Sequence, residues 1–186
     1  MKKKITIILP IILLILGCYF TYEAIKIELK AQIGQILLEK AWNKTLIEGE
    51  PISPWSSFDS TPIFKLEIPK HKISQIVLNR NDGQTLAWGP GYHIESFHPI
   101  ENKITAISSH RDSHGAYIKN LQIGDIIKLQ DINENWYSFE IDEFIILNIK
   151  ENLSLKNNRI ILITCYPFDT VLINTPFRYI VSAKKI

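Results

Sequence analysis

Cysteine and excess charge are both scarce in this chain of 186 residues. It contains two cysteines, and only Cys165 lies outside an apolar N-terminal segment, so the remainder of the chain cannot form an internal disulfide. Without Lys2–Lys4, 18 basic and 19 acidic residues remain, which argues against the clustered positive charge of a nucleic-acid footprint. Internal repeats and low-complexity tracts are absent. A hydrophobic content of 46% with 22% charged residues indicates one globular domain with an appendage.

Charge is also absent from the N-terminal segment Ile5–Tyr22, which follows the three lysines Lys2–Lys4. At 1.5 Å per residue, a helix over this segment reaches about 27 Å, close to the bilayer core of about 30 Å. The lysines place the N-terminus in the cytoplasm. We therefore expect residues 1–22 to be a single-pass transmembrane anchor and the rest of the chain to lie outside the cytoplasm.

Two other fates of this N-terminal segment are a cleaved signal peptide and lipidation at Cys18. No small-x-small cleavage site follows the apolar stretch, which favours an uncleaved anchor. Leu16 stands where a lipoprotein signal usually has a smaller residue, so we expect Cys18 to be a thiol buried in lipid.

Between the anchor and the first strand, the sequence changes from helical to polar. Apolar residues recur at steps of three and four from Tyr22 to Trp42, which predicts a helix that is either a stalk or packed on the domain. The stretch from Asn43 to Ser60 is polar and reads as a linker whose aromatic end packs on the domain. We assign residues 23–60 to stalk and linker, and expect the β domain to fold without the residues up to about Asn43.

Short strands and turns dominate from residue 61 to residue 186. Many short strands without long intervening helices predict a mainly-β fold, either an antiparallel barrel or a sandwich. A single helical turn is expected near 116–121. The expected strands are 63–68, 73–78, 103–110, 126–130, 136–147, 159–165 and 177–183.

Cys165 ends the six-residue run Ile160–Cys165, which follows Arg159 and suits a buried strand. A reactive group at a strand end is fixed by the sheet and open to a substrate. An unpaired cysteine outside the cytoplasm is a free reactive thiol, half of an intermolecular bridge, or a buried inert residue. As a nucleophile, its thiolate would need a proton donor for the leaving amine and a donor for the oxyanion.

His110 is the histidine best placed to supply the proton. It closes an alternating run that begins at Ile104, and the charged pair Arg111 and Asp112 after it suits the rim of a sheet. A metal site built on His110, Asp112 and His114 would lack further ligands, so we expect no metal and no other cofactor.

Arg178 is the arginine best placed to bind the oxyanion, because a guanidinium stays charged and holds its donors in fixed directions. It opens the strand expected to return beside the one that ends in Cys165. Arg80, Arg111 and Arg159 compete for this role but lack that placement.

These three elements together resemble the sortases. Leu162–Cys165 is similar to the Leu-x-Thr-Cys nucleophile motif of that family, Ser108–Asp112 to the segment with its catalytic histidine, and Phe177–Tyr179 to the one with its catalytic arginine. The order along the chain also matches. Ser109 and Ile161 depart from the family pattern, which often has glycine and threonine there.

The resemblance is closest to the class GN sortases of Gram-negative bacteria. Pro54–Trp55, the His-Arg-Asp-x-His run of His110–His114 and the Cys-Tyr-Pro-Phe-Asp run of Cys165–Asp169 are similar to marks of that class. The similarity spans roughly Trp55 to the C-terminus. It implies a location in the inner membrane with the catalytic domain in the periplasm.

The resemblance further implies an eight-stranded sortase β-barrel and a transpeptidase. Cys165 would attack an LPxTG-like C-terminal sorting signal of a secreted protein and form a thioester. In some Gram-negative systems that secreted protein has an OmpA-like domain. His110 would transfer the protons, Arg178 would bind the carbonyl oxygen, and Thr164 would support the site. An amine acceptor would then resolve the thioester.

Three alternatives to a sortase that transfers its substrate to an amine follow from the same residues. The Ser-His-Gly run that ends at Gly115 echoes the L,D-transpeptidases, but Ala116 stands in place of their cysteine and nearly excludes them. The enzyme could hydrolyse the thioester only. The chain could also be a membrane-tethered β domain that binds a partner protein, with Cys165 inert.

Overall fold

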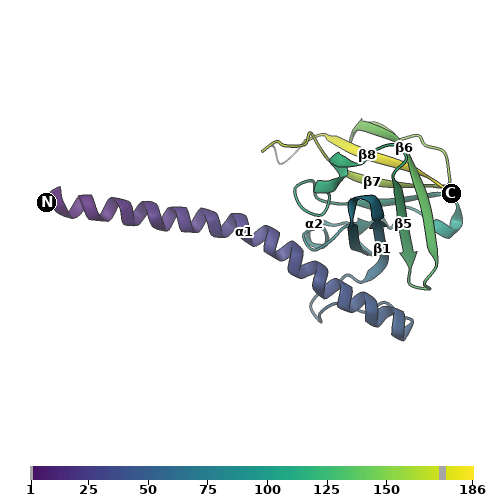
Figure 1. Ribbon diagram of the computed structural model, residues 1–186, viewed down its shortest axis with the longest axis horizontal. Coiled ribbons are helices and arrows are strands. Elements are labelled where there is room, and N and C mark those ends of the chain that lie inside the picture. Colours follow the sequence, from purple (N-terminus) through teal and green to yellow (C-terminus); the bar gives the residue numbers. More distant parts are fainter. Residues whose placement is uncertain (1, 172–174) are drawn as a thin grey trace.

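The strands of the computed structural model close into one barrel, with a long helix running away from it (Figure 1). The model describes residues 2–171 and 175–186, except the side chains of residues 2–12, 23–24 and 26–32. Around the barrel the order is β1-β2-β3-β4-β7-β8-β6-β5, and pairing of β1 with β5 closes it. The strands are β1 Pro62–Ile68, β2 Ile73–Leu78, β3 Gly91–Tyr92, β4 Ile104–Ser108, β5 Ile126–Asp131, β6 Trp136–Asn148, β7 Arg159–Tyr166 and β8 Phe177–Lys185.

This barrel confirms the expected mainly-β, eight-stranded fold and decides against a sandwich. Seven of its strands were expected from the sequence, and the two-residue β3 was not. The short helical turn is present as η3. The helices are α1 Lys2–Glu48, α2 Gly83–Leu86, and the 3₁₀ turns η1 Pro69–His71, η2 Pro99–Glu101 and η3 Ala116–Asn120.

The centre of strand β7, Ile160–Ile163, is apolar on both faces because both faces are covered. Ile160 and Leu162 point into the barrel core. Ile161 and Ile163 lie on the outer face, where they belong to a second cluster that includes Leu153 from the loop between β6 and β7. A strand buried on both sides needs no polar alternation, which explains the uninterrupted run in the sequence.

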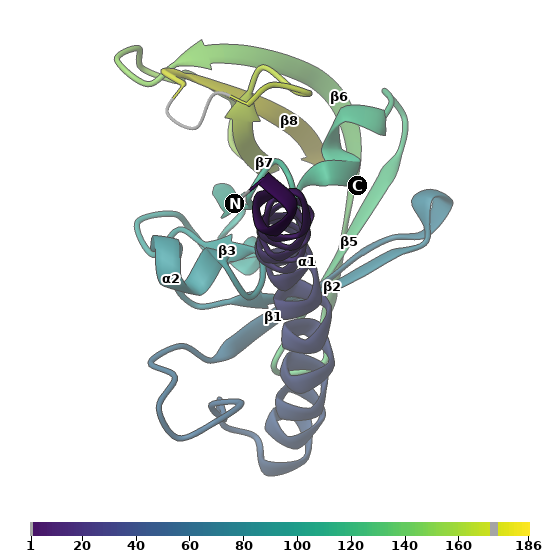
Figure 2. The same cartoon turned by 90° about the vertical axis from the view of Figure 1, so that its left-hand side faces the viewer.

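Helix α1 continues without a break through the expected stalk and ends at Glu48, beyond the expected end at Trp42. Its C-terminal half lies beside β1 and β2 (Figure 2). Leu38 and Trp42 are almost fully buried there, in a cluster with Ile76 and Leu78 of β2. This packing argues against the expectation that the domain is independent of residues up to Asn43.

The end of the polar linker packs as expected. Trp55 stacks on Phe58 with ring centroids 4.4 Å apart, and it also meets Trp88 edge-on. Phe58 belongs to the same cluster as Trp42. The linker and the helix end are therefore parts of one apolar cluster outside the barrel.

The expected membrane span Ile5–Tyr22 lies in α1. Among the described residues, no helix has a stretch both long and apolar enough to cross a membrane. Residues 5–12 of that span lie outside the described side chains.

Candidate active site

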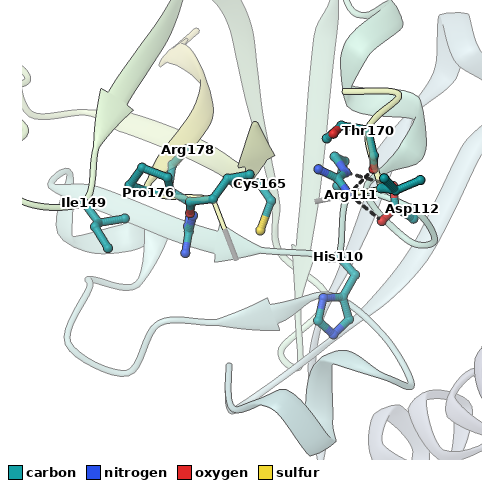
Figure 3. Close-up of a pocket in the computed structure, with 10 residues that line it drawn as sticks. His110, Arg111, Asp112, Ile149, Cys165, Thr170, Pro176 and Arg178 are labelled. Atoms are coloured by element: carbon teal, nitrogen blue, oxygen red, sulfur yellow. Dashed lines mark hydrogen bonds and ion pairs between the residues drawn. The ribbon is translucent and has the colours of Figure 1, made fainter. Parts of the chain in front are cut away.

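Three residues singled out in the sequence line one cavity. His110, Cys165 and Arg178 come from three separate parts of the chain and surround a hollow of about 670 Å³. In the close-up view the sulfur of Cys165, the ring of His110 and the guanidinium of Arg178 point toward a common space (Figure 3). The remaining lining residues are Arg111, Asp112, Ile149, Thr170, Val171, Thr175 and Pro176.

The antiparallel pairing of β7 with β8 sets Cys165 directly opposite Arg178. Side chains of such a pair lie on the same face of the sheet with Cβ atoms about 4.5–5.5 Å apart. Arg178 Nη1 donates to the carbonyl oxygens of Thr175 and Phe177, at 2.8 and 2.9 Å. These bonds hold the guanidinium at the start of β8, next to the partly exposed Cys165 thiol.

His110 does not end a strand, contrary to expectation. Strand β4 stops at Ser108, and His110 is exposed in the turn that follows. The Ser109 N–H still bonds to Ile163 of β7, but the His110 carbonyl accepts from the N–H groups of Ser113 and Gly115. That turn takes the place of further sheet pairing, so the position of the imidazole depends on the loop.

Thr164, the expected supporting residue, ties this turn to β7. It is 2% exposed, and its Oγ1 donates to the Ser109 carbonyl oxygen at 2.9 Å. Gly115 packs against the same point: a Cβ there would lie 2.5 Å from Ser109 Oγ and 2.9 Å from the His110 oxygen. The residue before His110 is therefore held by Thr164, and the close packing requires a glycine at position 115.

His114 is buried and does not line the cavity. It is 5% exposed, and its Nε2 finds no hydrogen-bond partner in the part of the chain that the structure describes. Burial, with a smaller contribution from the charge of His110, lowers the pKa of His114 to about 4. Among the described residues, no three His, Cys, Asp or Glu side chains gather as a metal site.

Arg111 is a second residue that the sequence placed wrongly. The rim position expected for the Arg111–Asp112 pair holds for Asp112, whose side chain is 75% exposed, but the Arg111 side chain is only 7% exposed. The hydrogen-bonded pair raises the pKa of Arg111 and lowers the pKa of Asp112. Adjacent opposite charges were visible in the sequence, but nothing local showed which loop would cover the arginine.

The structure combines a closed eight-stranded barrel with a cysteine, a histidine and an arginine around one cavity. Comparisons with known proteins show which family has this combination. A family model described as "Sortase domain" matches residues 66–186. The chain belongs to the sortase family.

A curated relative, Sortase D of Bacillus subtilis (strain 168), is 32% identical over 126 residues, which are 65% of this chain and 62% of that protein. The match thus spans less than two thirds of the relative. Among solved structures, a Clostridium perfringens Sortase D5 transpeptidase superposes with a TM-score of 0.62 at 20% identity, covering 84% of this chain and 98% of that one. A lid mutant of sortase A from Corynebacterium diphtheriae gives 0.60 at 16% identity, covering 83% and 94%. These structures support the fold.

Proposed function

We propose that this sortase is a cysteine transpeptidase that cleaves an LPxTG-like sorting signal near the C-terminus of a secreted protein and transfers it to an amine. The observation that carries the proposal is the cavity shared by Cys165, His110 and Arg178. A thiol, an imidazole and a guanidinium are the nucleophile, the proton carrier and the oxyanion donor that amide transfer requires.

In the first half-reaction, the thiolate of Cys165 attacks the carbonyl carbon of the scissile amide. Arg178 donates hydrogen bonds to the oxygen as negative charge develops on it. The carbon–nitrogen bond then breaks, and His110 gives its proton to the departing amine, leaving a thioester on Cys165.

In the second half-reaction, an incoming amine gives a proton to His110 and attacks the thioester carbonyl. A new amide forms and the Cys165 thiolate leaves, which restores the enzyme. Water in place of the amine would give a carboxylic acid, so the acceptor decides between transfer and hydrolysis.

Selective alkylation tests whether Cys165 is the nucleophile. Cys18 is also exposed, so the full-length chain carries Cys18→Ser in every sample. Iodoacetamide should modify Cys165 in the native protein and stop cleavage of an LPxTG-like peptide, and Cys165→Ala should stop cleavage without unfolding. A thiol that reacts only in denaturant would favour the partner-binding alternative. Mass spectrometry of products with and without an added amine separates transfer from hydrolysis.

We also propose that residues 1–22 anchor the enzyme in the inner membrane with the barrel in the periplasm. The uncharged stretch Ile5–Tyr22 after three lysines supports this topology. Reporter fusions after residue 48 test it, since a periplasmic reporter should be active and a cytoplasmic one silent. The reverse pattern would refute the anchor orientation.

Class GN, with an OmpA-like secreted substrate, is the subclass that the motifs support. The relative named Sortase D supplies class D as its competitor. Cleavage of peptides taken from secreted proteins of each kind, compared by kcat/KM, distinguishes the two.

A further inference from the structure

The side chain of Arg111 lies almost entirely out of solvent beside the cavity. Burying a guanidinium is costly unless its donors are satisfied. Nε and Nη2 bind the two carboxylate oxygens of Asp112 at 2.8 and 3.0 Å. Nη1 donates to the Pro167 carbonyl at 2.8 Å, and Nη2 donates to the Thr170 carbonyl at 3.0 Å. An ordinary surface ion pair would need only the two bonds to Asp112. The two bonds to backbone carbonyls are additional.

The two carbonyls belong to the loop that directly follows Cys165. Pro167 is two residues beyond the sulfur, and Thr170 itself lines the cavity. The guanidinium therefore joins the turn that carries His110 to the loop that leaves Cys165, across more than 50 residues of sequence. Neither partner loop belongs to a strand at these contacts, so sheet pairing does not hold them together.

His110 is thus fixed from both sides. On one side, Thr164 of β7 binds the carbonyl of Ser109. On the other side, Arg111 binds the loop after β7. Both contacts attach the residues that flank the imidazole to the chain segment around Cys165, and they leave the His110 side chain itself exposed to the cavity.

Charge supports the same role. Figure 3 shows Cys165 between Arg178 on one side and Arg111 on the other. A positive charge close to a thiol favours the thiolate, and the Coulomb interaction between Arg111 and Cys165 contributes to raising the pKa of the guanidinium. The charged or titratable groups that line the cavity with Cys165 are His110, Arg111, Asp112 and Arg178.

We propose that Arg111 is a positioning residue for the sortase reaction, which fastens the His110 turn to the loop after Cys165 and keeps a positive charge beside the thiol. This inference rests on the proposed function. Its competitor is a structural ion pair that stabilises the fold and has no particular effect on catalysis.

Arg159 offers a matched control. Its Nη1 and Nη2 bind Asp142 at 2.6 and 2.9 Å, Nη1 also donates to Ser182, and its side chain is 12% exposed. It is an equally enclosed bidentate arginine on the same strand as Cys165, about 20 Å away along that strand. Glutamine at either position removes the charge and the fork of donors.

The experiment compares Arg111→Gln, Arg111→Lys and Arg159→Gln in the full-length chain carrying Cys18→Ser. Urea unfolding measures stability, peptide cleavage gives kcat and KM, and iodoacetamide rates across pH give the midpoint at which Cys165 becomes reactive. We expect both glutamine variants to lose stability. Arg111→Gln should lower kcat/KM about 100-fold, mostly in kcat, since a displacement near 1 Å costs about that much. Arg159→Gln should change it less than about threefold.

The pH midpoint of Cys165 alkylation separates the two parts of the proposed role of Arg111, which are fastening the His110 turn and keeping a positive charge beside the thiol. It should rise in Arg111→Gln, stay near the parent value in Arg111→Lys, which keeps the charge, and stay unchanged in Arg159→Gln. Lysine cannot reproduce the fork, so kcat should remain low in Arg111→Lys although the midpoint is restored.

Equal losses of kcat/KM in Arg111→Gln and Arg159→Gln, with unchanged midpoints, would overturn the inference while leaving the proposed function intact. If the parent protein cleaves no sorting-signal peptide, the proposed function fails instead. The alkylation midpoints then still decide whether Arg111 acts on the thiol, because they need no substrate.

Discussion

Replacing Thr164 by valine tests whether the contact that holds the His110 turn matters for catalysis. Valine keeps the shape of threonine and removes only the hydroxyl. Thr164 is 2% exposed, and its single described hydrogen bond runs from Oγ1 to the Ser109 carbonyl at 2.9 Å. The change therefore deletes one bond in a buried place and creates almost no cavity.

The size of the stability loss follows from that buried carbonyl. Ser109 is 8% exposed, so water reaches its carbonyl poorly once the hydroxyl is gone. Leaving a buried acceptor without its partner costs about 1–3 kcal/mol. In a chain of this length, each kcal/mol lowers Tm by about 2–4 °C. Because His110 follows directly, we also expect kcat/KM to fall about 10- to 100-fold.

Thr105→Val is the matched control for this substitution. Thr105 is fully buried on β4, and its Oγ1 donates to the Phe97 carbonyl at 2.8 Å. The same substitution there deletes the same kind of bond on the neighbouring strand, at a loop that does not line the active-site cavity. We expect a similar loss of stability and a kcat/KM within about twofold of the parent.

The assay is cleavage of an LPxTG-like peptide at 25 °C, after urea unfolding has been used to check that both variants are fully folded at that temperature. Equal activity in Thr164→Val and Thr105→Val would refute the reasoning, whatever their stabilities. A large activity loss in both would show that activity follows general stability.

Three further predictions concern other parts of the molecule. Arg178→Ala should lower kcat about 10²–10³-fold, the usual cost of removing an oxyanion donor, and unchanged kinetics would rule out that role. His114→Gln should flatten the pH dependence of the free energy of unfolding. The folded-state pKa of His114, about 4, lies below the unfolded value of 6.5, so the parent protein loses about 3 kcal/mol of stability as pH falls from 6.5 to 4. Above pH 7 the stability of parent and variant should change with pH in the same way. Deleting residues 1–30 should leave Tm nearly unchanged. Deleting residues 1–43 removes Trp42 from its cluster and should lower the free energy of unfolding by at least about 3–5 kcal/mol. Equal Tm values for the two truncations would show that the helix end does not stabilise the barrel.

The strands that place Cys165 and Arg178 could be predicted from the sequence because their signals are local. The run Ile160–Cys165 is rich in β-branched residues and is soon followed by Pro167, which is enough to place a buried strand and its end. The sequence also predicts that the next strand returns beside β7, but it does not fix the register of the two strands. The structure supplies that register and sets Cys165 opposite Arg178.

The position of His110 and the burial of Arg111 could not be predicted, because both depend on contacts between distant loops. Alternation from Ile104 predicted a strand up to His110, but hydrogen bonds within the turn end β4 at Ser108. Charged neighbours such as Arg111 and Asp112 are usually solvent-exposed. The carbonyls that bury the arginine come from a loop more than 50 residues away, and no periodicity encodes that approach.

The helix end was misjudged for a related reason. The segment from Asn43 is polar in sequence, which predicted a linker, yet α1 continues to Glu48, and Leu38 and Trp42 just before that segment anchor the last turns of α1 on β2. Two large buried side chains outweigh several exposed polar ones, because the apolar area removed from water is large while the polar side chains stay solvated. Composition averaged over a segment therefore hides such an anchor.

The active site thus has two parts with different mechanical support. Cys165 and Arg178 are neighbours across an antiparallel ladder, so their separation changes only if the sheet itself distorts. His110 stands outside the ladder and keeps its place through the side-chain contacts of Thr164 and Arg111. Substitutions at those two residues should therefore displace the His110 imidazole while leaving Cys165 and Arg178 in register. In such variants a loss of kcat would exceed any loss of native alkylation by a neutral electrophile, whereas distortion of β7 or β8 would lower both together.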